Sequence, residues 1–162
     1  MVFGMTTLTF VHVLLSVLGI VSGFVVLFFG FYRSRPLAAW TAFFLIAMIA
    51  TTLTGFGFAR DHVMPSHGVG VASFLALVIA VVALYGFRLA RGWRRIYVLS
   101  TLLALYLNVF VLIVQAYQKV PRLQALAPTQ TEPVFVITQA VALVVFLVLG
   151  TLAVKRFQYR PS

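Results

Sequence analysis

The sequence predicts an all-α integral membrane protein, a bundle of five transmembrane helices with its N-terminus outside and its C-terminus in the cytoplasm. Three observations predict this fold class. The chain of 162 residues is 63% hydrophobic and only 9% charged, with a mean hydropathy of +1.12. Its apolar residues form five long runs, and its basic residues lie almost entirely between those runs.

The composition excludes an ordinary soluble domain. Soluble domains are about 45–50% apolar and about 25% charged, and a chain this short has too little interior to bury so much apolar surface. The net charge of +10 would suggest nucleic acid in a soluble protein. Basic residues in short connections between apolar runs are instead typical of membrane orientation. We therefore expect a lipid bilayer, and no nucleic acid, as the partner of this surface.

Five runs are long enough to cross a hydrocarbon core, which takes roughly 20 helical residues. They are residues 8–32, 37–59, 69–87, 96–117 and 134–154. Because the runs are continuous and do not alternate, they predict helices and not barrel strands. Together they make residues 1–162 a single transmembrane domain. In the longest connection, the segment from Arg122 to Leu126 predicts a short helix on the outer surface.

The basic residues divide unequally between the two predicted sides. Nine of them share one side: Arg33, Arg35, Arg88, Arg91, Arg94, Arg95, Lys155, Arg156 and Arg160. The other side carries Arg60, Lys119 and Arg122 together with the acids Asp61 and Glu132. The positive-inside rule places the nine in the cytoplasm. Four aromatic residues flank the same side and are interpreted as interfacial anchors: Tyr32, Trp40, Trp93 and Tyr97.

The first run has one face of small and polar residues. His12, Ser16, Gly19, Gly23 and Gly30 recur at spacings of three, four and seven, so they share one side of a helix. Glycines in such a pattern predict a seam where another helix packs closely. The same geometry directs the imidazole of His12 into the bundle.

The fourth run carries a polar stripe, because Thr101, Asn108 and Gln115 are seven residues apart. Asn108 lies near mid-membrane, roughly 18 Å along the helix from Ile96. Its amide needs a partner in hydrocarbon, and two interpretations are open: a hydrogen bond between helices, or the lining of a substrate or ion path. We predict a polar pocket in the outer half whose walls are His12, Ser16, Asn108, Gln115 and Gln139.

All histidines and acidic residues of the chain gather at the predicted outer face: His12, His62, His67, Asp61 and Glu132. Three interpretations are open. They are solvated or locally hydrogen-bonded residues, or ligands of a b-type haem or a divalent metal, or part of a proton or solute path. The inner half has no histidine, which argues against a relay through two haems.

The chain resembles an uncharacterised group of small bacterial multi-span membrane proteins. The resemblance rests on residues 107–111 (LNVFV), 115–121 (QAYQKVP) and 126–133 (LAPTQTEP). It implies a bacterial cytoplasmic (inner) membrane and assigns no activity and no catalytic residue. The layout is also loosely similar to transmembrane b-type cytochromes, from which the chain departs because it lacks an inner pair of histidines.

Sequence motifs of common enzymes are absent, so we expect no catalytic residue. The leading hypothesis is a binding or accessory membrane protein with its polar pocket at the outer, periplasmic face. The first alternative is a haem-binding or metal-binding redox protein that interacts with quinone, and the second is a small channel or transporter. A second copy of the chain or a larger membrane complex stays open as a partner.

Overall fold

The computed structural model describes residues 6–57 and 65–159, with side chains described from residue 68 in the second range. Over these residues the chain is helical and has no strand. Five helices are long and apolar enough to cross a membrane: Thr7–Phe31, Ala38–Phe56, Gly68–Gly86, Trp93–Lys119 and Pro133–Arg156. The structure therefore confirms the predicted five-helix class, and the chain is a multi-pass membrane protein.

Two of the five spans change helix type before they end. Helix α1 (Thr7–Val25) continues as the π-helix η1 (Val26–Phe31), and α3 (Pro65–Val81) continues as the π-helix η2 (Val82–Gly86). The others are regular: α2 (Ala38–Phe56), α4 (Trp93–Lys119), α5 (Pro121–Leu126) and α6 (Pro133–Arg156). The short α5 confirms the helix predicted in the longest connection.

Local sequence explains several helix ends. Pro121 and Pro133 stand at the first positions of α5 and α6, where the missing N–H of proline leaves no helical hydrogen bond unmade. Thr6 caps α1, because its side-chain oxygen accepts a hydrogen bond from the backbone N–H of Thr9 at 3.2 Å. The spans differ from the predicted runs by a few residues, as expected where apolar runs grade into loops.

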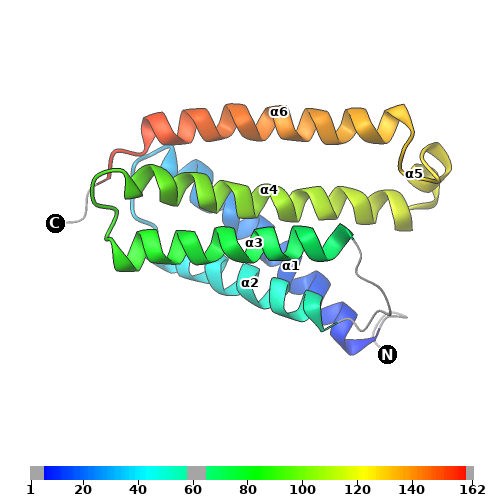
Figure 1. The fold of residues 1–162 in the computed structure, drawn as a ribbon, viewed down its shortest axis with the longest axis horizontal. Helices are drawn as coiled ribbons and strands as arrows, with labels where there is room; N and C mark the ends of the chain where they lie inside the picture. The colour runs from blue at the N-terminus through cyan, green and yellow to red at the C-terminus, as the bar shows by residue number, and fades with distance from the viewer. Residues whose placement is uncertain (1–5, 58–64, 160–162) are drawn as a thin grey trace.

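Helix α4 lies at the centre of the bundle. It contacts α1, α3, α5 and α6, while α1 also packs against α2, and α2 against α3 (Figure 1). Helix α6 forms one edge, where it packs on α4 and on η1. The hydroxyl of Tyr32 donates a hydrogen bond to the backbone oxygen of Leu149 at 3.2 Å and fastens α6 to the end of η1.

The glycine seam predicted on the first helix is confirmed. Gly19 and Gly23 are buried. A Cβ atom built on Gly19 would lie 3.2 Å from the sulfur of Met48 on α2. A Cβ atom on Gly23 would lie 2.7 Å from Leu105 on α4 and 2.8 Å from the ring of Phe44 on α2. Because Gly19 and Gly23 have no side chain, α1 can approach α2 and α4 closely.

Large apolar side chains cover the outside of the bundle. Ile46 on α2 and Ile137 on α6 are 67% and 60% exposed, for example, and every long helix carries others of this kind. Contiguous apolar surface of this extent would aggregate in water. It suits contact with lipid acyl chains, in agreement with the expected bilayer partner.

The charged residues occupy the two ends of the bundle. The end that holds the η1–α2 connection, the η2–α4 connection and the end of α6 carries eight basic residues and is called the basic end here: Arg33, Arg35, Arg88, Arg91, Arg94, Arg95, Lys155 and Arg156. Lys119 and Arg122 lie at the opposite end, beside α5. Arg60 and Arg160 fall outside the described residues.

Candidate functional site: a cavity at the basic end

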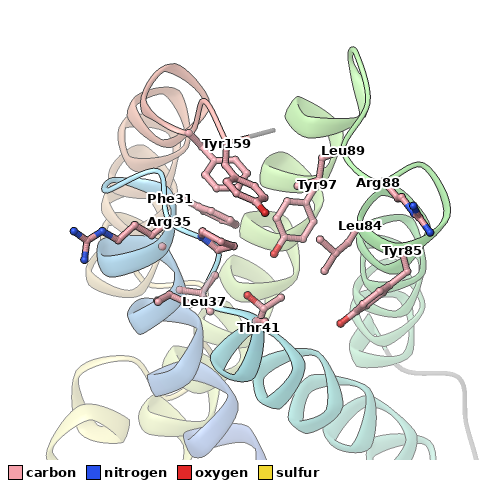
Figure 2. Close-up of a pocket in the computed structure, with 15 residues that line it drawn as sticks. Phe31, Arg35, Leu37, Thr41, Leu84, Tyr85, Arg88, Leu89, Tyr97 and Tyr159 are labelled. Atoms are coloured by element: carbon pink, nitrogen blue, oxygen red, sulfur yellow. The ribbon is translucent and has the colours of Figure 1, made fainter. Parts of the chain in front are cut away.

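A cavity of about 220 Å³ opens at the basic end of the bundle. Its walls come from five segments: η1, the connection to α2 with the first turn of α2, the end of η2 with residues 88–89, Tyr97 near the start of α4, and Phe157 and Tyr159 beyond α6 (Figure 2). Figure 2 shows Leu84 and Tyr97 turned toward each other across this space. The cavity therefore exists only in the assembled bundle, because no single helix or hairpin supplies it.

Aromatic rings form one wall of the cavity. Phe31 of η1 meets Tyr97 of α4 edge to face, with ring centroids 5.5 Å apart, and meets Phe157 at 5.0 Å. Phe157 lies 6.2 Å from both Tyr97 and Tyr159. Phe31, Tyr97 and Phe157 are almost fully buried. Such packed ring pairs stabilise one arrangement beyond their burial alone, so this wall is preorganised.

Residues 157–159, here called the C-terminal segment, are fastened across the basic end. The N–H of Gln158 donates a hydrogen bond to the hydroxyl of Ser34 at 2.9 Å. The carbonyl of Gln158 accepts one from the guanidinium of Arg94 at 3.4 Å. These contacts join α6 to the η1–α2 connection and to α4, and they place Phe157 and Tyr159 against the cavity.

Unusual backbone surrounds the same cavity. Both π-helices line it, η1 through Val26 and Phe31 and η2 through Leu84. π-Helical turns are rare and frequently mark functional sites. Of the five non-glycine residues with positive φ in the described part of the chain, four lie at this end: Ser34, Arg88, Leu89 and Arg91, at φ 45–56°. Each costs of order 1–3 kcal/mol, so the strain of the described backbone is concentrated around the cavity.

The charged residues of the lining are two arginines at its mouth. Arg35 and Arg88 stand on opposite sides, exposed, with their guanidinium groups directed away from the cavity (Figure 2). The chain has two carboxylate side chains, and the one within the described residues, Glu132, lies at the opposite end of the bundle. The field at the mouth is therefore positive and attracts anions.

No protein-family model, no curated protein and no solved structure matches the chain. What the protein binds must therefore be inferred from its own cavity, charges and hydrogen bonds.

The residues of the predicted outer pocket bond to separate neighbours. A ring nitrogen of His12 on α1 pairs with the hydroxyl of Thr54 on α2 at 3.0 Å. The amide of Asn108 on α4 donates to the carbonyl of Ala104 at 3.0 Å and to the hydroxyl of Ser73 on α3 at 3.4 Å. His12 thus bridges α1 and α2, and Asn108 bridges α3 and α4.

The predicted pocket residue of α6, the fifth membrane span, also bonds to a neighbouring helix. Gln139 on α6 donates to the carbonyl of Phe110 on α4 at 3.2 Å, while Ser16 and Gln115 are half-buried. No hydrogen bond between described residues joins any two of the five predicted pocket residues. The geometry favours the interhelical role that was one of the two interpretations of Asn108, and the outer pocket stays a prediction.

Replacing Asn108 with leucine tests that interhelical role. We expect the free energy of unfolding in detergent to fall by about 0.6 kcal/mol, a value typical of hydrogen bonds between transmembrane helices. The variants Ser73→Ala and Asn108→Leu/Ser73→Ala complete a double-mutant cycle that isolates the contact from other effects of the substitution. A coupling energy near zero would contradict a stabilising contact between the two side chains.

The described residues supply no cluster of metal ligands. Within them, no three His, Cys, Asp or Glu side chains lie close enough to share an ion. Asp61 and His62 fall outside the described residues, and the side chain of His67 in α3 is likewise not described. The haem and metal interpretations therefore receive no support from this part of the chain.

Glu132 instead organises the turn that precedes α6. Its carboxylate accepts hydrogen bonds from the hydroxyl of Thr129 at 2.8 Å and from the backbone N–H groups of Thr129 and Thr131 at 3.1 and 3.0 Å. Desolvation opposes ionisation, but these hydrogen bonds outweigh it and lower the pKa of Glu132 from its ordinary value. This carboxylate therefore has a local structural role in the connection between α5 and α6.

One sequence interpretation at the basic end needs correction. Tyr97 is 3% exposed and belongs to the cavity wall, so it is not an interfacial anchor facing lipid. Its position on α4 turns it toward Phe31, whereas an anchor must point outward. In the sequence, the cavity is indicated only by the many aromatic residues beside arginines at one end. That pattern is also typical of ordinary interfacial belts, so it does not by itself distinguish a cavity.

Proposed function

We propose that the chain is a non-catalytic binding protein of the bacterial cytoplasmic membrane, with its N-terminus outside and its C-terminus inside, and that its ligand is amphipathic. The observation that carries this proposal is the aromatic cavity between two arginines at the basic end. This function keeps the binding role expected from the sequence and moves the site from the outer face to the cytoplasmic face.

The size and position of the cavity support an amphipathic ligand. Its volume of about 220 Å³ lies below the roughly 300–1,000 Å³ of pockets that enclose a drug-sized molecule. It therefore accommodates part of a ligand, and the remainder extends from the mouth. Because the cavity lies where the apolar spans give way to basic connections, an apolar part inside and a polar part outside match its surroundings.

The side chains that line the cavity support binding in preference to catalysis. The lining presents arginines and hydroxyl groups, including those of Thr41 and Tyr97, and no histidine or carboxylate. General acid–base chemistry near neutral pH relies mostly on such groups. A site with apolar walls and few polar groups at its mouth has the ordinary composition of a small-molecule binding pocket.

The orientation is testable because the chain has no native cysteine. Ala90 and Ala125 are exposed residues in the connections at the two ends. A membrane-impermeant maleimide is expected to label Ala125→Cys in intact cells, and to label Ala90→Cys only after the membrane is opened, because the positive-inside rule places the basic end in the cytoplasm. Equal labelling of both in intact cells, or the reverse pattern, would contradict the orientation.

Filling the cavity tests the binding site. Leu84→Trp adds a large ring where Figure 2 shows the side chain entering the cavity. Native mass spectrometry of protein purified from membranes is expected to detect a retained amphiphile on the unaltered protein and at least tenfold less of it on this variant. Leu147→Trp is the matched control, because Leu147 is 60% exposed on the outside of α6. Retention that is equal in both variants would overturn the proposed site.

A further inference from the structure

We infer that the ligand of this cavity is an anionic glycerophospholipid of the adjacent leaflet, with acyl-chain carbons in the aromatic cavity and its phosphate held between Arg35 and Arg88. The inference rests on the proposed function, because it assigns the chemical class of the amphiphile. It commits to a lipid and excludes a soluble phosphate compound as the main ligand.

The charge at the mouth selects an anion. The basic end carries eight basic residues, and the described carboxylate lies at the other end of the bundle. Arg35 and Arg88 are the two charged residues of the lining. Basic pockets between transmembrane helices are typical binding sites for acidic lipid headgroups. A zwitterionic amphiphile would gain less from this arrangement, because its own cation offsets the attraction of its phosphate to the arginines.

The uncharged interior of the cavity favours a position of the ligand's phosphate at the mouth. Apart from the arginines, the polar side-chain groups of the lining are the neutral hydroxyls of Thr41, Tyr85, Tyr97 and Tyr159, and the other side chains are aromatic or aliphatic. A phosphate inside would lose its hydration without gaining a cationic partner, which is strongly unfavourable. The apolar part of the ligand must therefore enter, and the phosphate must stay at the mouth with the guanidinium groups.

The backbone holds both arginines in place while their side chains stay exposed. The N–H of Arg35 donates to the carbonyl of Gly30 at 3.0 Å, at the end of η1. Arg88 follows η2 in a left-handed conformation with φ 45°. Arginine bonds phosphate through two parallel N–H groups, and its long side chain can rotate toward the mouth. The two arginines thus bracket the position where a headgroup would emerge.

The experiment measures the lipid preference of the whole chain in a neutral detergent by native mass spectrometry. Phosphatidylglycerol and phosphatidylcholine with identical acyl chains are titrated separately. The unaltered protein is expected to bind phosphatidylglycerol at least tenfold more tightly. Arg35→Gln/Arg88→Gln is expected to lower the affinity for phosphatidylglycerol to that for phosphatidylcholine. Should the double variant not fold, each single variant is expected to reduce the ratio of the affinities for phosphatidylglycerol and phosphatidylcholine about threefold.

The matched control removes the same charge from the same end. Arg91→Gln/Arg95→Gln alters two exposed arginines that do not line the cavity, and Arg91 has a left-handed φ of 49° that compares with that of Arg88. This variant is expected to keep at least half of the preference. Equal loss in both double variants would show attraction by general charge, and that result would overturn the assignment of Arg35 and Arg88.

Further outcomes separate this inference from the proposed function. Equal affinity for the two lipids, or displacement of lipid by an uncharged quinone at equal concentration, would overturn the anionic lipid while the binding function stands. If glycerol phosphate competed as strongly as the intact lipid, the headgroup alone would account for binding. That result would contradict the placement of the acyl chain in the cavity. Leu84→Trp is expected to weaken both lipids. If the affinity of that variant for both lipids were unchanged, the cavity would not be the binding site, and the proposed function would be wrong as well.

Discussion

Replacing Phe157 with alanine is expected to lower the free energy of unfolding by about 3 kcal/mol, near the lower end of the range for buried phenylalanines. Phe157 is 3% exposed and packs on Phe31 and Tyr97. Its removal leaves a void beside an existing cavity, and the neighbouring rings of Phe31 and Tyr97 are already packed on each other edge to face. The void therefore has little means to collapse, which is the condition under which truncation costs most.

Unfolding of this variant can be followed by circular dichroism during titration of dodecylmaltoside micelles with sodium dodecyl sulfate. Phe43→Ala is the control, because Phe43 lies on the outer surface of α2 and is 45% exposed; its expected loss is below about 0.5 kcal/mol. The Phe157 variant should also retain less lipid, because one wall of the site is missing. A loss no larger than that of the control would show that the C-terminal segment contributes little to the fold.

Substituting Gly23 with leucine is expected to cost about 1–3 kcal/mol or prevent assembly of the bundle, because an overpacked core must displace its neighbours. Even a Cβ atom at this position would come within 3.0 Å of Leu105 and of the Phe44 ring. Both neighbours are fully buried and have no exposed side to which they can turn. The substitution therefore separates α1 from α2 and α4 together.

A comparison of alanine substitutions isolates the steric effect. Glycine to alanine within a helix gains up to about 1 kcal/mol from helix propensity. Gly150→Ala on α6 should show that gain, because its Cβ would meet Leu102 at an ordinary 3.6 Å. Gly23→Ala should show no gain or a loss in the same detergent titration. Stabilisation of both variants to the same extent would contradict a tight three-helix contact at Gly23.

Sequence reasoning located the spans because span length is a local property. Each run had to cross a hydrocarbon core, and the short α5 followed from its own composition. Two features of the spans gave no such signal. Residues 26–31 and 82–86 are continuous apolar sequence without proline, so nothing local separates a π-helix from an α-helix there. The surrounding packing decides the hydrogen-bond register in these turns.

The same distinction between local and non-local information explains the site. Helical spacing predicted that His12 and Asn108 face neighbours within the bundle, and both form hydrogen bonds to an adjacent helix. Spacing could not say which neighbours, because the order of helices around the bundle is not encoded in periodicity. The cavity depends on Phe157, which follows two basic residues beyond the last predicted span, so its local sequence does not indicate burial. Only the folded chain brings it against Phe31 of the first span.

The central position of α4 has a consequence for biogenesis. Helices α1 and α2 contact each other directly, so this hairpin can associate as soon as both have entered the membrane. Helix α6 packs on α4 and η1, and α3 packs on α2 and α4. The ribosome must therefore deliver roughly three-quarters of the chain before α4 can pack on its neighbours, and until then the seam at Gly23 lacks one of its partners. Insertases or chaperones that shield half-assembled spans would be needed most in that interval.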